Sequence, residues 1–234
     1  MRLTAIVPSA GKSERMKATF EKPYLLLKDK PVLAHTLLVL ERSPLVREVI
    51  LLVRRPRIAL AKKLVRHFGL KKVAGIYAGG ATRFESVWEG LKRVPPASDF
   101  VLVHDGARPL VSEALIRRVV RGARRYGAAI PALPISSTVK QGKRGFVMKT
   151  LVRSELWEVQ TPQVFRTSLL LSGYRKARKE GVAATDCAAL VERLGKKVHL
   201  VPGEPRNLKI TTKEEWMLSA ILMGGKGKTP CAWE

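Results

Sequence analysis

A net charge of +25, from 44 basic and 19 acidic residues, distinguishes this chain of 234 residues, 46% of which are hydrophobic. That apolar share supports a sizeable core and excludes a disordered chain, and no apolar run approaches the length of a membrane span. The length suits one α/β domain, which we expect at residues 1–223, followed by a disordered tail rich in glycine and lysine at 224–234.

The positive charge favours anionic partners such as nucleotides, sugar phosphates, RNA or a membrane surface. Solvated helix faces explain the basic run from Arg54 to Lys72 and the arginines between positions 117 and 125. Aromatic residues make up only 6% and do not interleave with these runs, which argues against nucleic acid as the primary partner. Cys187 and Cys231 lie far apart without metal-ligand companions, so we expect a cytoplasmic protein with no disulfide framework and no zinc site. Because the first residues already predict a strand, we expect no signal peptide.

Apolar runs alternate with amphipathic stretches over the first 133 residues. The apolar runs predict strands at Leu3–Val7, Glu48–Val53, Val73–Tyr77, Phe100–His104 and Ala128–Leu133. The stretches between them predict helices at Val32–Leu40, Arg57–Phe68, Arg83–Arg93 and Glu113–Tyr126. This alternation implies a mainly parallel sheet covered on both faces. Ligands of such sheets bind at the carboxyl ends of strands, where we expect the loops after Val7, Tyr77 and His104 to meet.

The alternation breaks after Leu133, where a turn at Gln141–Gly145 between two short apolar flanks predicts a β-hairpin. The hairpin belongs to an arm of about residues 136–157, and because a lone hairpin is marginal in water we expect it to pack on something such as a second subunit. The remaining pattern predicts helices at Ser168–Glu180 and 186–194, strands at 198–201 and Leu208–Ile210, and a last helix. A capping box, Thr212-x-x-Glu215, begins that last helix.

The loop after the first strand has the residue types of a phosphate-binding turn. Its small residues let backbone N–H groups approach phosphate oxygens. They are Pro8, Ser9, Ala10 and Gly11. Arg15 and Lys22 follow and supply positive charge. A Walker A loop would need a second glycine where Ile6 stands, and the Rossmann pattern G-x-G-x-x-G is absent. The alternative is an ordinary strand-to-helix loop with two solvated cations.

Two further loops carry candidate ligand-binding residues. Gly79 and Gly80 allow close backbone approach before a capped helix that begins with Arg83 and in which Ser86 would face the turn; a plain strand-to-helix loop is the alternative. Asp105 ends a hydrophobic strand, where a carboxylate is costly unless it is paired or binds a cation or a hydroxyl. We therefore consider Mg²⁺ or a ribose hydroxyl as its ligand, or a structural pair between Asp105 and Arg108. His104 is expected to pack or hydrogen-bond rather than act as a base.

Together these segments resemble the 2-C-methyl-D-erythritol 4-phosphate cytidylyltransferase family of the non-mevalonate isoprenoid pathway, from Ala5 to about Met223. The motifs that carry the resemblance are Pro8-Ser-Ala-Gly11 with Arg15-Met16, Lys22, Gly79-Gly-Ala-x-Arg83-x-x-Ser86-Val87, Val103-His-Asp-x-Ala-Arg-Pro109, Arg153-x-x-Leu-Trp157, Thr161-Pro-Gln163, Thr185-Asp186 and Asn207-x-Lys-Ile-Thr211. Any one of them arises easily by chance, but all of them in order are specific.

The resemblance implies a single Rossmann-like nucleotidyltransferase domain with a mainly parallel sheet and an extended β-hairpin dimerisation arm. It implies that CTP and methylerythritol phosphate condense to a CDP-linked product and pyrophosphate, with Mg²⁺ as cofactor and no metal ligand identified. Arg15, Lys22, Lys209 and, from the partner of a homodimer, Arg153 would be catalytic. The residues implied in nucleotide binding are Pro8, Ser9, Ala10, Gly11, Gly79, Gly80, Arg83, Ser86 and Asp105. Those implied in binding the sugar phosphate are Asp105, Arg108, Arg153, Thr161, Thr185, Asp186 and Lys209.

The physics agrees with such a site, because an attacking phosphate is already ionised and needs positioning and cationic screening instead of a base. The chain departs from the family pattern at four positions: Glu14, Pro23, Cys187 and Arg206. None of them removes a proposed catalytic cation. Two alternatives are a ribitol-5-phosphate cytidylyltransferase, which the Gly106-Ala107 pair disfavours, and a basic RNA- or membrane-associated protein on the same scaffold.

Overall fold

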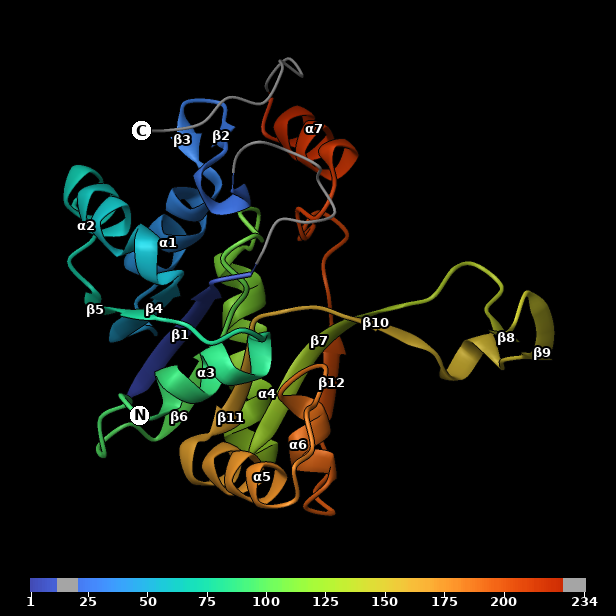
Figure 1. Ribbon diagram of the computed structural model, residues 1–234. Helices are drawn as coiled ribbons and strands as arrows, with labels where there is room; N and C mark the ends of the chain where they lie inside the picture. The colour runs from blue at the N-terminus through green and yellow to red at the C-terminus, as the bar shows by residue number, and fades with distance from the viewer. Residues whose placement is uncertain (12–20, 225–234) are drawn as a thin grey trace.

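A mixed eight-stranded sheet forms the centre of the computed structural model, which describes residues 1–11 and 21–224 (Figure 1). Four strands make its parallel half: β1 (Leu3–Ser9), β4 (Glu48–Val53), β5 (Val73–Ala78) and β6 (Phe100–Val103). β1 pairs with β4 and β6, and β4 pairs with β5, all in parallel. The loops that follow β1, β5 and β6 therefore leave the sheet at the same edge, which we call the carboxyl edge.

The other half of the sheet mixes directions. Its strands are β7 (Ala128–Pro134), β10 (Trp157–Val159), β11 (Gln163–Arg166) and β12 (His199–Pro202). β11 lies between β6 and β7 and is antiparallel to both, so β6 and β7 point the same way. β12 runs parallel to β7 and β10 antiparallel to it. The predicted α/β class with a mainly parallel core is confirmed.

Helices cover both faces of the sheet. Successive residues of β1 point to opposite faces, so its apolar side chains pack in two separate clusters. Ala5 and Val7 pack in one core cluster with α1 (Val32–Arg42), α2 (Ile58–His67) and α4 (Glu113–Tyr126). Ile6 packs in the other cluster. The helices of that second cluster are α3 (Arg83–Leu91), α5 (Thr167–Lys179) and α6 (Ala188–Glu192).

A small third cluster sits beside the carboxyl edge. It joins α7 (Lys213–Leu222) to the two-residue strand β2 (Leu26–Leu27) through Ile210 and Trp216, and β3 (Lys30–Pro31) pairs with β2. The predicted capping box of α7 is present: the Thr212 side chain accepts from the Glu215 N–H, and the Glu215 carboxylate accepts from the Thr212 N–H. Within the described residues, three 3₁₀ turns complete the elements: η2 (Lys22–Tyr24), η3 (Arg55–Arg57) and η4 (Arg153–Glu155).

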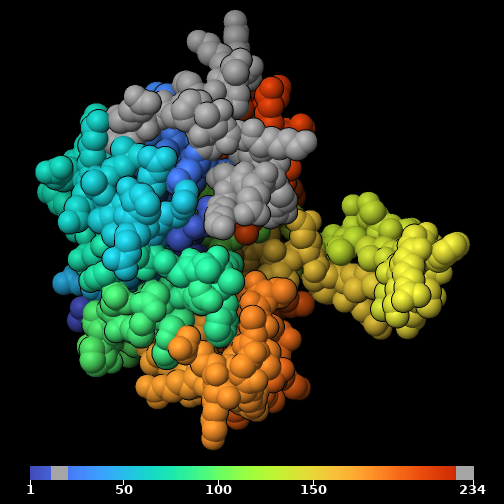
Figure 2. Space-filling view, in the orientation of Figure 1, coloured from blue at the N-terminus to red at the C-terminus, as the bar shows by residue number. Residues whose placement is uncertain are grey.

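The predicted hairpin is confirmed and projects from the body as an arm (Figures 1 and 2). It consists of β8 (Lys140–Lys143) and β9 (Phe146–Thr150), and every residue of both strands is exposed. The exposed residues include Phe146, Val147 and Met148, with 76%, 64% and 64% of their surface accessible. The arm therefore presents apolar side chains that nothing in its own chain covers, among the described residues.

Several sequence expectations need correction. The strand predicted at Leu208–Ile210 is wrong: the segment pairs with no strand of the described residues, and the Ile210 N–H donates to the Ala107 carbonyl oxygen at 2.8 Å. β11 was not predicted because only its two central residues, Val164 and Phe165, are apolar, too few to give a pattern. α6 begins at Ala188 and not at Asp186, since the Asp186 carboxylate accepts from the Ala189 N–H and so lies outside the helix.

Two expectations concern the limits of the described chain. The expected disordered tail lies outside the described residues, except for Gly224. Among the helices that are described, none combines the length and apolar character needed to cross a membrane.

Candidate active site

The loops after β1, β5 and β6 meet at the carboxyl edge, as predicted, and line a cavity of about 190 Å³. The cavity is lined by Pro8, Ser9, Ala10, Gly11, Lys22, Pro23, Gly80, Ala81, Thr82, Arg83, Ser86, Asp105, Ala107, Lys209, Ile210 and Thr211. All the predicted nucleotide-binding residues line it except Gly79, which packs closely against two of the lining residues, Ala10 and Ser86. Residues far apart in the sequence thus share one cavity.

Small residues are required where these loops touch. A Cβ atom added to Gly79 would lie 2.6 Å from the Ala10 Cβ and 2.7 Å from the Ser86 Oγ, so a larger residue would push the two loops apart. A Cβ at Gly106 would lie 1.9 Å from the Ser9 Oγ. That Oγ is itself buried and bonds to no atom of the described residues. A buried hydroxyl without a partner in the phosphate-type turn marks a place where a ligand oxygen would be satisfied.

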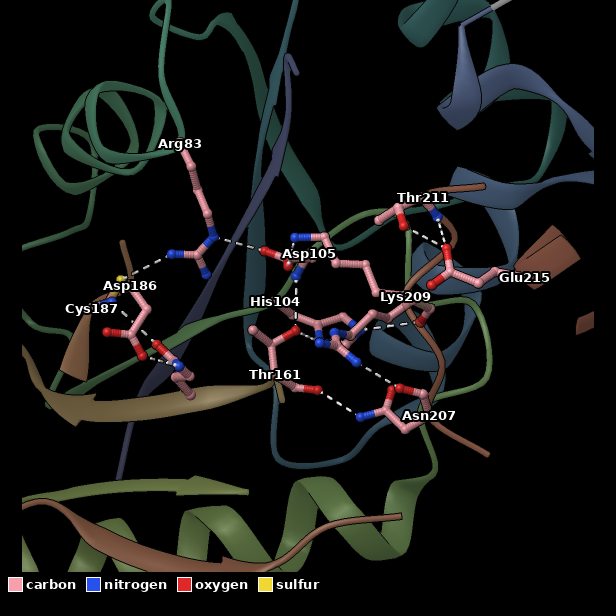
Figure 3. Close-up of polar contacts among 12 residues, drawn as sticks. Arg83, His104, Asp105, Thr161, Asp186, Cys187, Asn207, Lys209, Thr211 and Glu215 are labelled. Carbon is pink, nitrogen blue, oxygen red and sulfur yellow. Dashed lines mark hydrogen bonds and ion pairs between the residues drawn. The ribbon is translucent and has the colours of Figure 1, made fainter. Parts of the chain in front are cut away.

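Asp105 is the charged centre of the site (Figure 3). It is 6% exposed, and its Oδ1 accepts from the Arg83 Nε at 2.9 Å while its Oδ2 accepts from the Lys209 Nζ at 2.8 Å. Burial alone would raise the pKa of this carboxyl, but the charges of Arg83 and Lys209 outweigh burial and hold the pKa well below its usual range. Asp105 therefore stays ionised and fixes two cations at the cavity wall.

The structural pair considered between Asp105 and Arg108 is wrong. The Arg108 Nη1 donates instead to the Asn207 carbonyl oxygen at 2.7 Å. Arg108 is only 7% exposed, and its Nε is buried without an acceptor among the described residues. Burial lowers the pKa of this guanidinium, and the charge of Asp105 partly offsets that effect. Arg108 thus brings a buried cation with an unsatisfied donor to this edge of the sheet.

A second cavity of about 500 Å³ adjoins the first and shares Arg83, Asp105 and Lys209 with it. It also contains Arg108, Thr161, Thr185 and Asp186, which are the predicted sugar-phosphate residues. The two predicted binding sets therefore line neighbouring cavities, and the network of Arg83, Asp105 and Lys209 belongs to both.

Asp186 is held in place by Gln163, which ends the motif Thr161-Pro-Gln163 but was given no role from the sequence, and by Ala189. Its Oδ2 accepts from the Gln163 Nε2 at 2.8 Å and its Oδ1 from the Ala189 N–H at 3.0 Å. The Gln163 Oε1 accepts from the Cys187 N–H, and the Cys187 Sγ lies 3.8 Å from the Arg83 Nη1. Burial raises the pKa of the Cys187 thiol, so the side chain that contacts the Arg83 guanidinium here is neutral.

Thr161 and His104 support Asp105 from below. The Thr161 Oγ1 accepts from the Asp105 N–H at 3.1 Å and bonds to the His104 Nδ1 at 2.9 Å. Burial lowers the pKa of His104 to about 4, so the neutral ring accepts from Thr161 and its Nε2–H donates to the Arg108 carbonyl oxygen. The expectation that His104 hydrogen-bonds and is not a base agrees with this geometry. Thr161 lines the second cavity, but its hydroxyl is engaged in holding Asp105.

Lys22 enters the first cavity from η2, and an ion-pair clamp holds the segment that carries it. The Glu21 Oε1 accepts from the Arg54 Nη1 at 2.5 Å and lies 3.2 Å from the Arg57 Nε. The next two residues, Pro23 and Tyr24, are buried. Two members of the basic run from Arg54 to Lys72 are therefore anchors and not merely solvated charges. The signal in the sequence was Glu21 itself, an acid next to a catalytic-type lysine in a very basic chain.

Of the other two predicted catalytic residues, one lies outside the described part of the chain and one lies on the arm. Arg15 lies in residues 12–20, outside the described residues, as does Glu14. Arg153 lies on the arm, exposed, where its Nη1 donates to the Ser136 carbonyl oxygen at 2.9 Å. Arg153 lines neither cavity of its own chain.

A small-residue loop and several cations at the carboxyl edge of a mainly parallel sheet define a nucleotide-binding α/β protein. The model of one family, 2-C-methyl-D-erythritol 4-phosphate cytidylyltransferase, matches residues 3–224. This chain belongs to that family, whose members are nucleotidyltransferases.

Relatives and solved structures cover almost the whole chain. The family member from Geotalea uraniireducens is 42% identical over 226 residues, which are 95% of this chain and 97% of the relative. The 4-diphosphocytidyl-2C-methyl-D-erythritol synthase structure from Anaerococcus prevotii superposes with a TM-score of 0.84 at 31% identity and covers 95% of this chain and 96% of that one. The cytidylyltransferase structure from Thermus thermophilus has a TM-score of 0.76 at 32% identity and covers 95% and 98%.

Proposed function

We propose that this chain condenses CTP with 2-C-methyl-D-erythritol 4-phosphate to give 4-diphosphocytidyl-2-C-methyl-D-erythritol and pyrophosphate, in non-mevalonate isoprenoid biosynthesis. The observation that carries the proposal is the pair of adjoining cavities that share Arg83, Asp105 and Lys209. One cavity suits a nucleotide and the other a second phosphate ester, with fixed cations where the two would meet.

CTP would occupy the first cavity. The turn from Pro8 to Gly11 would cradle its phosphates, with the unpartnered Ser9 Oγ as an additional donor. The cytidine would lie against Gly79, Gly80, Arg83 and Ser86. Lys22, together with Arg15 beyond the described residues, would oppose the negative charge that grows on the α-phosphate.

The sugar phosphate would occupy the second cavity. Asp105, Thr185 and Asp186 would accept hydrogen bonds from its hydroxyl groups, while Lys209 and Arg108 would hold its phosphate. The buried Arg108 Nε, which has no acceptor among the described residues, supports that role. Thr161 would act through Asp105 and not by touching the ligand.

The reaction needs no general base, because the attacking phosphate oxygen is already ionised. Its new bond to the α-phosphorus forms as the bond from that phosphorus to the pyrophosphate oxygen breaks. The difficulty is to bring two anions in line, and fixed cations lower that repulsion without reorganising. A network in which Asp105 holds Arg83 and Lys209 in position supplies this preorganisation.

A homodimer would complete the site, with Arg153 of one arm reaching the second cavity of the partner subunit. Two observations support this arrangement: Arg153 lines neither cavity of its own chain, and Phe146, Val147 and Met148 on the arm are at least 64% exposed. Exposed apolar side chains of this size favour association with another surface.

Mg²⁺ is the expected cofactor, but the described residues do not fit a metal site built by the protein alone. Both oxygens of Asp105 are paired with cations, and both of Asp186 accept hydrogen bonds. No group of three His, Cys, Asp or Glu side chains that could hold a metal occurs within the described part of the chain. Because Mg²⁺ is often held by substrate phosphates, we infer that it accompanies the triphosphate. We also infer one nucleotidyltransferase domain over residues 1–223 and a cytoplasmic location.

Pyrophosphate release tests the proposal directly. The purified chain with CTP and Mg²⁺ should release pyrophosphate with 2-C-methyl-D-erythritol 4-phosphate and much more slowly with ribitol 5-phosphate. Release with ribitol 5-phosphate alone would contradict the proposed acceptor. Lys209→Met should abolish most turnover, while Lys213→Met, at the exposed start of α7, should leave it unchanged.

A further inference from the structure

A third cavity, of about 800 Å³, lies far from the candidate active site, at the opposite edge of the sheet. It is built by the end of α4, the start of α5 and the residues that lead into β7 and β12. Gly127 and Val198 precede parallel strands that point towards the carboxyl edge, whereas Arg166 ends β11, which runs the other way. All three positions therefore lie at the amino edge. We call this cavity, with its lining residues Arg125, Tyr126, Gly127, Arg166, Ser168, Leu169, Ser172, Lys196, Lys197, Val198 and His199, the amino-edge cavity.

Four cations and no acid line the amino-edge cavity. They are Arg125, Arg166, Lys196 and Lys197, and all four are exposed. None of them has an ion-pair partner among the described residues, although nearby Arg117 and Arg193 are paired with Glu113 and Glu180. Four unscreened like charges on three separate segments repel one another, so an anion placed between them would be bound favourably.

Positive charge continues outside the cavity along α4. Arg121 and Arg124 are exposed on this helix, and neither is ion-paired within the described chain. The start of α5 adds partial positive charge, because its first turn contains no acid and no side chain of the described residues accepts from its first N–H groups. The basic surface is therefore longer than the cavity itself, which suits an extended anion better than a compact one.

Folding also brings aromatic rings to this surface, although the sequence does not interleave aromatic and basic residues. The Tyr126 ring lies 4.2 Å from the His199 ring, centre to centre, and Tyr126 is 49% exposed. The Arg125 guanidinium lies 5.1 Å from the centre of the Tyr126 ring. Cations beside an exposed aromatic ring are the combination with which proteins bind single strands, through phosphates and base stacking.

We propose that the amino-edge cavity and the adjoining outer face of α4 bind single-stranded nucleic acid, with the cations on its phosphates and Tyr126 against a base. Binding is tolerant of sequence, because the cavity presents exposed charges and hydroxyls without buried groups that would read base edges. It is a role additional to the proposed cytidylyl transfer and does not depend on it.

Fluorescence anisotropy with a labelled 20-nucleotide single-stranded RNA tests the proposal. The variant Arg125→Ala/Arg166→Ala/Lys196→Ala/Lys197→Ala should bind at least tenfold more weakly. Loss of four phosphate contacts should also reduce the slope of log affinity against log salt by about 3, since each contact contributes about 0.7 for a single strand. Circular dichroism melting confirms that the variant is folded.

The matched control removes the same charge elsewhere, through Arg42→Ala/Lys62→Ala/Arg66→Ala/Lys71→Ala around α1 and α2. These four residues are exposed, and α1 and α2 lie on the opposite side of the ribbon from α5 (Figure 1). The control should change the affinity by less than threefold. Equal losses in the two variants would overturn the proposal in favour of a diffuse charge effect. No RNA binding by the parent chain would overturn it outright.

Tyr126 provides an independent readout. Stacking on one base is worth about 1–3 kcal/mol, so Tyr126→Ala should weaken RNA binding by about five- to a hundredfold, and Tyr126→Phe should preserve binding. Inorganic polyphosphate, which has the charge but no bases, should compete in a way that Tyr126→Ala does not alter. If polyphosphate and RNA respond equally to Tyr126→Ala, the occupant is a plain polyanion and the nucleic-acid assignment is wrong.

Discussion

The two edges of the sheet use positive charge in opposite ways. At the carboxyl edge, Arg83 and Lys209 are fixed by a buried carboxylate, and Arg108 is held by a carbonyl oxygen. At the amino edge, Arg166 and its three cationic neighbours are exposed and make no ion pair among the described residues. The first arrangement holds each cation in a defined position, and the second produces a positive electrostatic potential over an exposed surface.

The difference shows why net charge alone is a poor guide to function. A cation that must stabilise a transition state has to stay within fractions of an ångström, so it needs partners that lock it. A cation that attracts a flexible polyanion needs exposure instead. The same residue types therefore serve different purposes, and their partners distinguish the two cases.

The most direct test of this difference between the two edges is to remove one cation from each. Lys22→Ala should lower turnover of CTP and 2-C-methyl-D-erythritol 4-phosphate by about a hundredfold or more, the scale for losing one contact to transition-state charge. Arg166→Ala removes the same charge at the amino edge and should leave turnover within twofold. Steady-state pyrophosphate release measures both. Similar losses in the two variants would mean that the whole field, and not position, drives the reaction.

The buried support beneath the carboxyl edge should appear in the pH dependence of stability. The pKa of His104 falls to about 4 in the folded chain from an ordinary value of about 6.5, so the unfolded chain binds the extra proton first. The stabilisation by neutral His104 is complete above pH 6.5 and disappears as the pH falls towards 4. Between pH 7 and pH 5 the free energy of unfolding should fall by about 2 kcal/mol from this group. Urea unfolding of the parent and of His104→Gln at both pH values checks this, because the variant lacks that part of the fall.

Much of the fold was predictable, because it depends on local patterns. Alternating apolar and amphipathic stretches located five strands and four helices, and Thr82 and Thr212 each accept the predicted capping bond. β11 was not predicted because only two of its four residues are apolar, and its place between β6 and β7 depends on pairing with distant strands. Leu208–Ile210 looked like a strand, but no neighbouring strand was available to pair with it.

The sequence predicted which residues belong to the site, but not which side chains pair with one another there. Motif order brought Arg83, Asp105 and Lys209 into one set, yet only the fold shows that a single carboxylate holds both cations. Arg108 was the natural partner by proximity in sequence, but its side chain points to the Asn207 carbonyl oxygen. Neither Glu21 nor Gln163 was given a role, because each holds residues that lie 23 to 36 positions away and the sequence does not show such pairings.

The arm carries a cation of a third kind, Arg153, which we propose acts in the site of the partner subunit. Arg153→Ala should raise the KM for the sugar phosphate about tenfold while changing the KM for CTP little, because each cavity would hold one substrate. Arg144→Ala, at the tip of the same arm, is the matched control and should leave both constants unchanged. Mixing Arg153→Ala with Lys22→Ala subunits should restore part of the activity, since one site of each heterodimer would be intact. Heterodimers that form but remain inactive would contradict a shared site.

The smallest expected effect concerns the clamp that fixes Lys22. Glu21→Gln keeps the size of the side chain but removes the charge that holds Arg54 and Arg57, so η2 loses its anchor and Lys22 its fixed position. Turnover should fall about fivefold through kcat with the KM for CTP little changed, less than on losing Lys22 itself, because the cation remains present. Glu89→Gln is the control, since Glu89 also pairs with two cations, Lys92 and Arg93, but on the exposed side of α3. In the double variant Glu21→Gln/Lys22→Ala the first change should have no further effect; a fully multiplicative loss would show that Glu21 acts on the reaction by a route other than positioning Lys22.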